Sequence, residues 1–191
     1  FNHEAVAFDK FNNAYLTEDR SDGLIYKFVS KNPNNLEDGE LFALKVKGLT
    51  DSRNWEQSQT KLNISYQVEW VKIEDYDPDE DTVRHEGISK GATVFARPEG
   101  IIADNESVYI CCTSGGNLRK GQIFKINTIS PEKSSAELWY EVQDNSSLNM
   151  PDNIVIAPWG DLIVCEDNSD RNRLWGLNSN GSPYLIAQNS Y

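Results

Sequence analysis

Hydrophobic and polar positions along the chain fall into short runs that are typical of β-strands rather than helices. Residues 14–19, 108–113 and 162–167 are rich in β-branched, aromatic and aliphatic side chains. Turn signals separate such runs, among them Asp22-Gly23 and Asn180-Gly181. The pattern predicts an all-β fold built from short strands.

The predicted strands recur as an internal repeat. The first strand of each unit starts at a carboxylate, at Glu4, Glu99 and Asp152. The later strands of the three units, taken in the same order, are residues 14–19, 108–113 and 162–167, then 23–28, 121–126 and 173–177, then 41–46, 136–142 and 184–187. Four short strands per unit are the pattern of a β-propeller blade. We therefore predict about three four-stranded blades, over residues 1–48, 97–144 and 151–189.

Residues 49–96 break the repeat, and we interpret them as an insertion between the first and second blades. The segment is too long for an ordinary connection, and its part near residues 81–90 favours a helix. Three blades do not close a ring, because propellers use roughly four to eight. We therefore expect residues 1–191 to form one partial propeller within a longer polypeptide. A dimer or an uncounted blade would also remove the open edges.

Charge and composition exclude several classes of partner. The formal net charge is -12, which argues against nucleic acid and against docking on anionic lipid. The sequence contains no apolar run long enough for a transmembrane helix. The adjacent Cys111 and Cys112 should point to opposite faces of one strand as small buried side chains, whereas the role of Cys165 stays open. The chain starts at Phe1, without an export signal, and we interpret it as a processed product or a fragment.

An acidic run gives one candidate calcium loop. Aspartates alternate from residue 75 to residue 81, and Glu86 stands eleven residues after Asp75, a spacing that resembles an EF-hand. Glu80 occupies the position where that loop needs glycine, and Pro78 interrupts it. We therefore interpret the run as a solvated acidic loop.

The carboxylates at the strand starts give a stronger candidate site. In a propeller the first strand of each blade lines the central channel, so Glu4, Glu99 and Asp152 should converge. Converging carboxylates repel one another unless a cation or protons compensate. Their hard oxygen atoms suit calcium, magnesium, manganese or ferric iron. Asp19, at the end of a second strand, is expected to join them, and the choice between its later counterparts, residues 166 and 167, stays open.

Arg97 adds a positive charge to this group. It precedes Glu99 by two positions, so the two side chains can share a face of the strand. A guanidinium beside carboxylate-bound metal can hold a phosphate bidentately, although a salt bridge to Glu99 explains the same pairing. His3 is either a ligand or a structural residue. We find no serine-histidine-aspartate order, phosphate-binding loop or zinc spacing.

Several of these stretches resemble the PhoX-type alkaline phosphatases of bacteria. The matching residues are 3–5, 17–20, 23–28, 41–44, 81–82, 97–100, 151–153 and 165–167. Each motif is weak by itself, but their order and spacing together are specific. The resemblance covers most of the chain outside the insertion and suggests the central part of such a protein.

The resemblance implies a six-bladed propeller that acts as a metal-dependent phosphomonoesterase with calcium and ferric iron. It implies that Glu4, Asp19, Glu99 and Asp152 are metal ligands and that Arg97 contacts the substrate phosphate. It also implies export by the twin-arginine route to the periplasm or outside, and a monomer in the full-length form. The family's upstream iron-ligating cysteine has no counterpart here, so the iron ligands are incomplete.

Two other functions stay open at this stage. Six-bladed propellers that hydrolyse lactones or phosphotriesters also place carboxylates around calcium. A non-catalytic propeller could use the same carboxylates to hold a structural calcium ion, because one fold hosts many functions.

Overall fold

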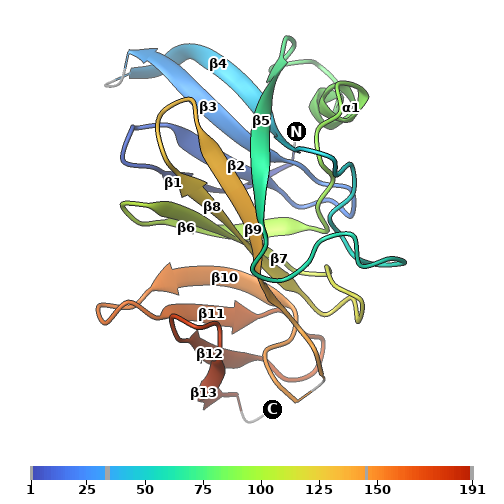
Figure 1. Ribbon diagram of the computed structural model, residues 1–191, viewed down its shortest axis with the longest axis vertical. Helices are drawn as coiled ribbons and strands as arrows, with labels where there is room; N and C mark the ends of the chain where they lie inside the picture. Colours follow the sequence, from blue (N-terminus) through green and yellow to red (C-terminus); the bar gives the residue numbers. More distant parts are fainter. Residues whose placement is uncertain (1, 33–34, 145, 190–191) are drawn as a thin grey trace.

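The computed structural model describes residues 2–32, 35–144 and 146–189. Phe1 and Tyr191, the two ends of the predicted domain, therefore lie outside the described residues. The regular structure of the described part consists of β-strands and one short helix, as Figure 1 shows. The predicted all-β fold class is confirmed.

Three units of four consecutive antiparallel strands follow one another along the chain. The first unit contains β1 (His3–Phe8), β2 (Ala14–Glu18), β3 (Ile25–Asn32) and β4 (Asn35–Val46). The second contains β6 (Pro98–Ala103), β7 (Ser107–Cys112), β8 (Gln122–Thr128) and β9 (Ser134–Glu141). The third contains β10 (Pro151–Ile156), β11 (Leu162–Glu166), β12 (Arg173–Leu177) and β13 (Pro183–Gln188). Each neighbour in sequence is a neighbour in the sheet, which is the blade arrangement of a β-propeller.

The insertion contains a strand that the sequence interpretation missed. β5 (Ser65–Ile73) pairs with β4 along six residues and with β9 at its start, so it joins the first two blades into one nine-stranded sheet. Tyr66, Val68 and Trp70 alternate with polar residues and are its partly buried side, which is the two-residue period of a half-buried strand. The expected helix is present as α1 (Val83–Ser89).

The hydrophobic core lies between the blades. Phe95 and Phe124 meet edge to face, with ring centroids 5.0 Å apart, in the cluster that joins the first and second blades. A second cluster, which includes Ile123 and Trp175, joins the second and third blades. Cys112 lies in the first cluster and Cys111 in the second, so the expected opposite orientation is confirmed. The blades are thus held by apolar contacts rather than by disulfides.

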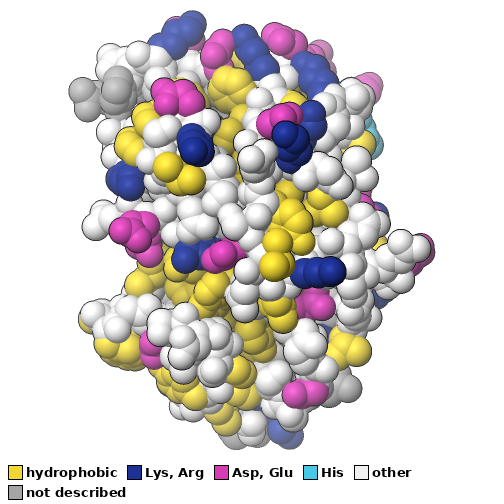
Figure 2. Space-filling model, in the orientation of Figure 1, with side chains coloured by type: hydrophobic (Ala, Val, Ile, Leu, Met, Phe, Trp, Pro, Cys, Tyr) yellow, Lys and Arg dark blue, Asp and Glu magenta, His cyan; other side chains and the backbone are white. Residues whose placement is uncertain are grey.

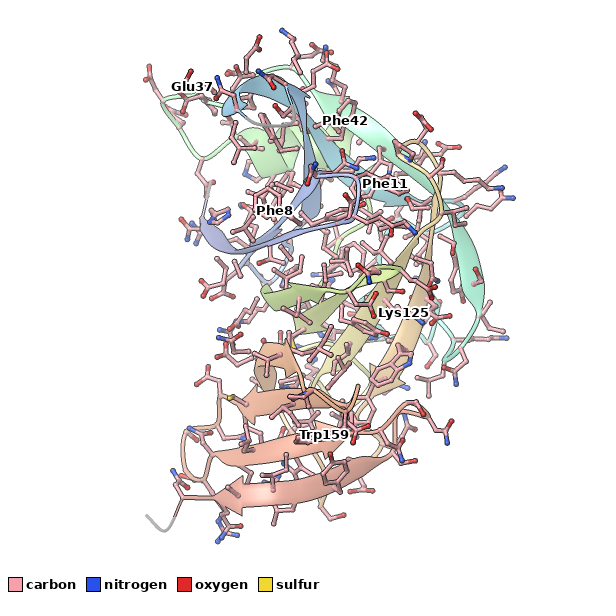
Figure 3. All side chains as sticks on the ribbon, turned by 90° about the vertical axis from the view of Figure 1, so that its left-hand side faces the viewer. Phe8, Phe11, Glu37, Phe42, Lys125 and Trp159 are labelled. Carbon is pink, nitrogen blue, oxygen red and sulfur yellow. The ribbon has the colours of Figure 1, made fainter. Side chains whose placement is uncertain are left out.

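The surface is mixed in charge over one part and apolar at the hairpin turns. On the face that Figure 2 shows, acidic and basic side chains intermingle over β3 to β5, where Lys72 pairs with Glu40 at 2.7 Å. Figure 3 shows Phe8 near the β1–β2 turn and Trp159 near the β10–β11 turn, and the latter side chain is 67 % exposed. Within the described residues, no helix is long and apolar enough to cross a membrane.

Candidate functional site

The candidate site lies at the end of the blades where each first strand begins and each second strand ends. The starting residues of the first strands pair with the last residues of the second strands, as His3 with Glu18, Pro98 with Cys112, and Pro151 with Glu166. The loops that follow β2, β7 and β11 leave from this end, on the right-hand side of Figure 1. The insertion begins and finishes at the same end. The repeat therefore brings loops from three blades together.

A register shift recurs at the predicted carboxylates. In each blade the ladder between the first and second strands is interrupted just after its first pair, between His3 and Val6, Pro98 and Ile101, and Pro151 and Ile154. Glu4, Glu99 and Asp152 all lie inside these irregular stretches. A bulge redirects a side chain and is common beside functional sites. The matched sequence positions of the three carboxylates are therefore matched in structure as well.

Arg97 has an unusual backbone conformation that its neighbours hold in place. Its φ angle is 52°, and Met150, the corresponding residue before β10, has a φ of 51°. Non-glycine residues seldom adopt this left-handed region. The Arg97 amide donates to the Arg20 carbonyl at 2.9 Å, and its carbonyl accepts from the Thr113 amide at 3.0 Å. These bonds fix where the side chain leaves the backbone.

The Arg97 guanidinium bridges carboxylates from the first and second blades. Its Nε lies 2.8 Å from Asp19 Oδ1 and its Nη2 lies 3.2 Å from Asp19 Oδ2, a two-point contact. Its Nη2 also lies 2.6 Å from Glu99 Oε1, close enough for an ion pair but without the angle of a hydrogen bond. The Asp19 contact, together with the charges of Glu99 and Asp167, raises the pKa of Arg97. The guanidinium therefore stays charged.

Glu99 is a buried carboxyl group without enough positive charge around it. The residue is only 4 % exposed. Burial, and then its hydrogen bond with Asp152, raise the pKa of Glu99 to about 9, although Arg97 opposes the shift. Gly100 allows this approach of β6 and β10, because a Cβ there would lie 2.3 Å from the Asp152 carbonyl oxygen. The Glu99 carboxyl group is therefore held in the protonated form over a wider pH range than an exposed glutamate.

The structure therefore joins four of the five predicted site residues. Asp19, Arg97, Glu99 and Asp152 form one connected group. Glu4 occupies the matching bulge but is exposed on β1, and among the described residues it makes no hydrogen bond or ion pair with that group.

The chemistry of the group suits a hard cation, although not as a complete set of ligands. Asp19, Glu99 and Asp152 offer carboxylate oxygens, and Glu99 Oε1 is buried without a hydrogen-bond donor. Burial raises the pKa of Glu99 in spite of the adjacent Arg97, so a cation at this position would favour its ionised form. Within residues 2–32, 35–144 and 146–189, no three acidic, histidine or cysteine side chains stand close enough together to hold a metal ion. Further ligands would have to complete such a site.

The sequence interpretation missed a buried ion-pair network that anchors the insertion next to this group. Arg84 of α1 reaches the fully buried Glu18, with Nη1 3.0 Å from Oε1, and its Nε lies 3.1 Å from Asp22. Asp81 pairs with Arg20 at 3.0 Å. The insertion therefore holds both neighbours of Asp19. The three-residue spacing of Asp81 and Arg84 was visible in the sequence, but their distant partners were not.

The acidic run has structural partners rather than the arrangement of a calcium loop. The Glu86 carboxylate accepts hydrogen bonds from the backbone amides of Glu74 and Asp75 and from Lys90. Burial alone would raise the pKa of Asp81, but Arg84 and Arg20 outweigh it and hold that pKa below its usual value. Glu86 and Asp81, two of the candidate calcium ligands, are therefore already engaged by other groups of the protein.

Fold and site together describe a propeller with an arginine among acidic side chains at one end of its blades. Comparison with known sequences gives the class: the family described as alkaline phosphatase PhoX matches residues 1–191. The chain belongs to this family, as its motifs indicated. A comparison with curated proteins found no match to this sequence.

A solved structure matches the fold. The match is "Pseudomonas fluorescens PhoX in complex with vanadate, a transition state analogue", with a TM-score of 0.68 and 18% sequence identity. It covers 97% of this chain and 44% of the other, so the chain spans less than half the length of that protein. At this identity the likeness establishes the shared fold.

Proposed function

We propose that this chain is the central part of a metal-dependent phosphomonoesterase whose reaction takes place beside Arg97. The observation that carries the proposal is the connected group of Arg97, Asp19, Glu99 and Asp152 at the end of the blades. Membership of the alkaline phosphatase PhoX family supports the same reaction.

Arg97 would bind and orient the phosphoryl group of the ester. Asp19 engages Nε and Nη2 of the guanidinium and Glu99 lies against Nη2, so Nη1 is the nitrogen that would donate to a phosphate oxygen. Asp19 fixes its orientation through the two-point contact, at 2.8 and 3.2 Å. A positioned positive charge stabilises the negative charge that the phosphoryl oxygens carry in the transition state.

Asp19, Glu99 and Asp152 would serve as metal ligands, with Glu4 as a fourth. When bound, the cations supply Lewis-acid polarisation of the phosphoryl oxygens. Calcium is the cation that these carboxylates suit best, and the family resemblance adds ferric iron. The family resemblance implies further iron ligands beyond these residues, and Cys111 and Cys112 are buried within the hydrophobic clusters.

Two other functions would use the same residues differently. A lactonase or phosphotriesterase would need the carboxylates around calcium but would give Arg97 no dianionic phosphate to bind. A non-catalytic propeller would hold calcium for stability. Membership of the alkaline phosphatase PhoX family favours the phosphomonoesterase over these alternatives.

The family also suggests where the protein works and in what form. We propose that the complete protein is a monomer in the periplasm or outside the cell. Its substrate is a phosphate ester, and the net charge of -12 argues against a nucleic-acid partner.

Substitution of Arg97 in the complete protein tests the proposal. Arg97→Ala should lower kcat/KM for 4-nitrophenyl phosphate by about 100- to 1,000-fold, the usual effect of removing a charge-stabilising donor. Arg97→Lys keeps the charge but loses the two-point geometry and should give an intermediate loss. Activity that is unchanged in both variants would contradict the role of Arg97. A preference for lactones or phosphotriesters would favour the alternative hydrolase.

A further inference from the structure

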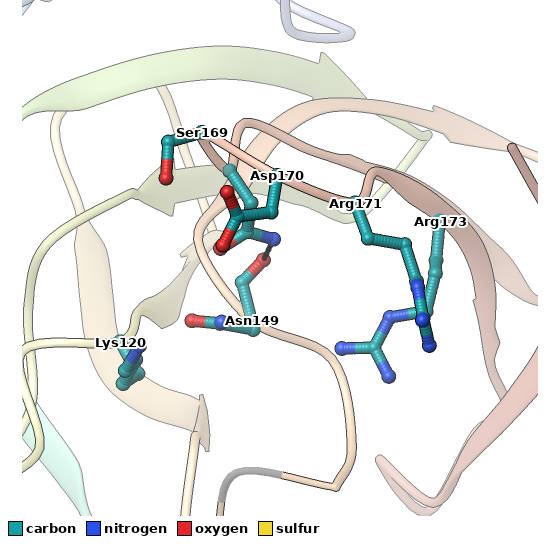
Figure 4. Close-up of a pocket in the computed structure, with 7 residues that line it drawn as sticks. Lys120, Asn149, Ser169, Asp170, Arg171 and Arg173 are labelled. Carbon is teal, nitrogen blue, oxygen red and sulfur yellow. Dashed lines mark hydrogen bonds between the residues drawn. The ribbon is translucent and has the colours of Figure 1, made fainter. Parts of the chain in front are cut away.

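A polar cavity lies at the same end of the blades as the proposed reaction site, between the second and third blades. Figure 4 shows this cavity, which has a volume of about 440 Å³. Lys120 of the loop after β7, Asn149 before β10, the loop residues 168–171 and Arg173 line it, and all of them are polar or charged. Aromatic and aliphatic side chains take no part in this lining. Ligand pockets are usually mostly apolar, so this composition indicates an unusually polar occupant.

Backbone contacts hold the cavity against the start of β10. The Lys120 carbonyl accepts the amide hydrogen of Met150, and the Asp167 amide donates to the Met150 carbonyl at 2.9 Å. Asn149 precedes Asp152 by three residues, which is at most about 10 Å of extended chain. The charge of Asp167 also acts on Arg97. A phosphoryl group beside Arg97 would therefore leave the rest of the ester within reach of the cavity.

Part of the wall is rigid. The Arg173 guanidinium makes several contacts with the buried Glu166, the shortest at 2.7 Å, and its Nη2 donates to the Ser147 carbonyl at 2.8 Å. Glu166 Oε1 also accepts a hydrogen bond from the backbone amide of Asn149 at 2.8 Å. Because its donors are used in this way, Arg173 shapes the cavity and is not the group that recognises a ligand.

The remaining polar groups are open to a ligand. Asn149 Oδ1 is buried and has no hydrogen-bond partner within the described part of the chain. Lys120 and Arg171 form no ion pair with other described residues, and Ser169 and Asp170 add a hydroxyl group and an acceptor. In the view of Figure 4, Asn149 lies between Lys120 on one side and the arginines on the other. Donors and acceptors therefore alternate around the cavity.

A neighbouring set of donors and acceptors matches hydroxyl groups. A hydroxyl both donates and accepts, so it satisfies the unpartnered Asn149 amide in either orientation of that amide. A hydroxyl oxygen also accepts from Lys120 or Arg171, whereas an aromatic leaving group would leave the buried Asn149 Oδ1 without a donor, which costs free energy.

We propose that this cavity is a subsite for a polyhydroxylated leaving group, so that the enzyme prefers sugar phosphates to aryl phosphates. The inference rests on the proposed function. It adds the class of alcohol to the reaction assigned above.

The test compares two esters on variants of the complete, metal-loaded protein. Asn149→Leu, which replaces the amide by an apolar group of similar size, should lower kcat/KM for glucose 6-phosphate by about three- to tenfold, the value of one hydrogen bond. The same variant should change kcat/KM for 4-nitrophenyl phosphate by less than twofold. Lys120→Ala should show the same preference, and it is the safer variant for folding because Lys120 belongs to a loop.

Lys133→Ala is the matched control, because Lys133 lies in the exposed turn between β8 and β9 and should affect neither ester. Equal losses on both esters, or an unchanged ratio of the two kcat/KM values in both variants, would overturn the subsite while leaving the phosphatase intact. Failure of the unsubstituted protein to hydrolyse either ester would reject the proposed function and the subsite with it.

Discussion

At the scale of single residues, the raised pKa of Glu99 indicates that the site favours compensation of its negative charge. Burial, followed by the neighbouring Asp152, raises the pKa of its carboxyl group to about 9. The proton of this carboxyl group is displaced when a cation takes its place, because both compensate the same negative charge. The raised pKa of Glu99 is therefore consistent with a site that is suited to a cation.

The stability of the metal-free protein should consequently depend on pH. Between the ordinary pKa of glutamate, about 4.5, and the raised value of about 9, the folded state binds more protons than the unfolded state. The free energy of unfolding, measured with a chelator present, should therefore fall as the pH rises through this range. Glu99→Gln removes the titrating group and should flatten the curve. A free energy of unfolding that rises with pH over the same interval would contradict this assignment.

At the scale of structural elements, the insertion supports the site from outside the blades. Arg84 of α1 is buried and forms an ion pair with the fully buried Glu18, the residue before Asp19. Breaking a buried pair by removing one partner leaves an uncompensated charge, which is strongly destabilising. The helix is therefore expected to matter for stability as well as for the placement of Asp19.

Arg84→Ala should lower the free energy of unfolding by about 3–5 kcal/mol, measured by urea denaturation of the metal-loaded complete protein. Arg84→Ala combined with Glu18→Gln should recover part of that loss, because the second change removes the unpaired charge. Lys72→Ala, which breaks the exposed pair with Glu40, is the control and should cost no more than about 1 kcal/mol. A loss for Arg84→Ala as small as that of the control would refute the anchoring role.

The same elements show why the sequence predicted the blades but not the insertion. Local alternation of side chains and turn residues predicts the strands within a blade. Because the unit is repeated, the sequence contains three examples of each strand. β5 has no counterpart in the repeat, although Tyr66, Val68 and Trp70 alternate as a strand should. Its pairing with β9 joins residues about seventy positions apart, which no local pattern encodes.

The candidate site, like the fold, was predictable from the sequence only in part. Matched repeat positions identified Glu99 and Asp152, because equivalent residues of successive blades approach the axis. The two-residue spacing of Arg97 and Glu99 suggested their pairing, which the structure contains at 2.6 Å. The contacts of Arg84 and the polar cavity around Asn149 were not predictable, since both depend on how loops from different blades fold over one end of the propeller.

At the scale of the whole molecule, the blades bring Arg97 and several carboxylates together at one end. Two apolar clusters lie between neighbouring blades, so each blade positions the next and the site depends on their packing. The chain covers 44% of the related PhoX structure. The complete protein is therefore the form in which activity should be measured.

We propose, above all, that a metal-dependent phosphomonoesterase reaction takes place beside Arg97. The most direct measurement is hydrolysis of 4-nitrophenyl phosphate by the complete protein, before and after exhaustive chelation, with elemental analysis of both samples. We expect bound calcium and turnover before chelation, loss of both afterwards, and recovery of turnover when the metals are restored. Turnover that survives after elemental analysis shows the protein to be free of metal would contradict the account.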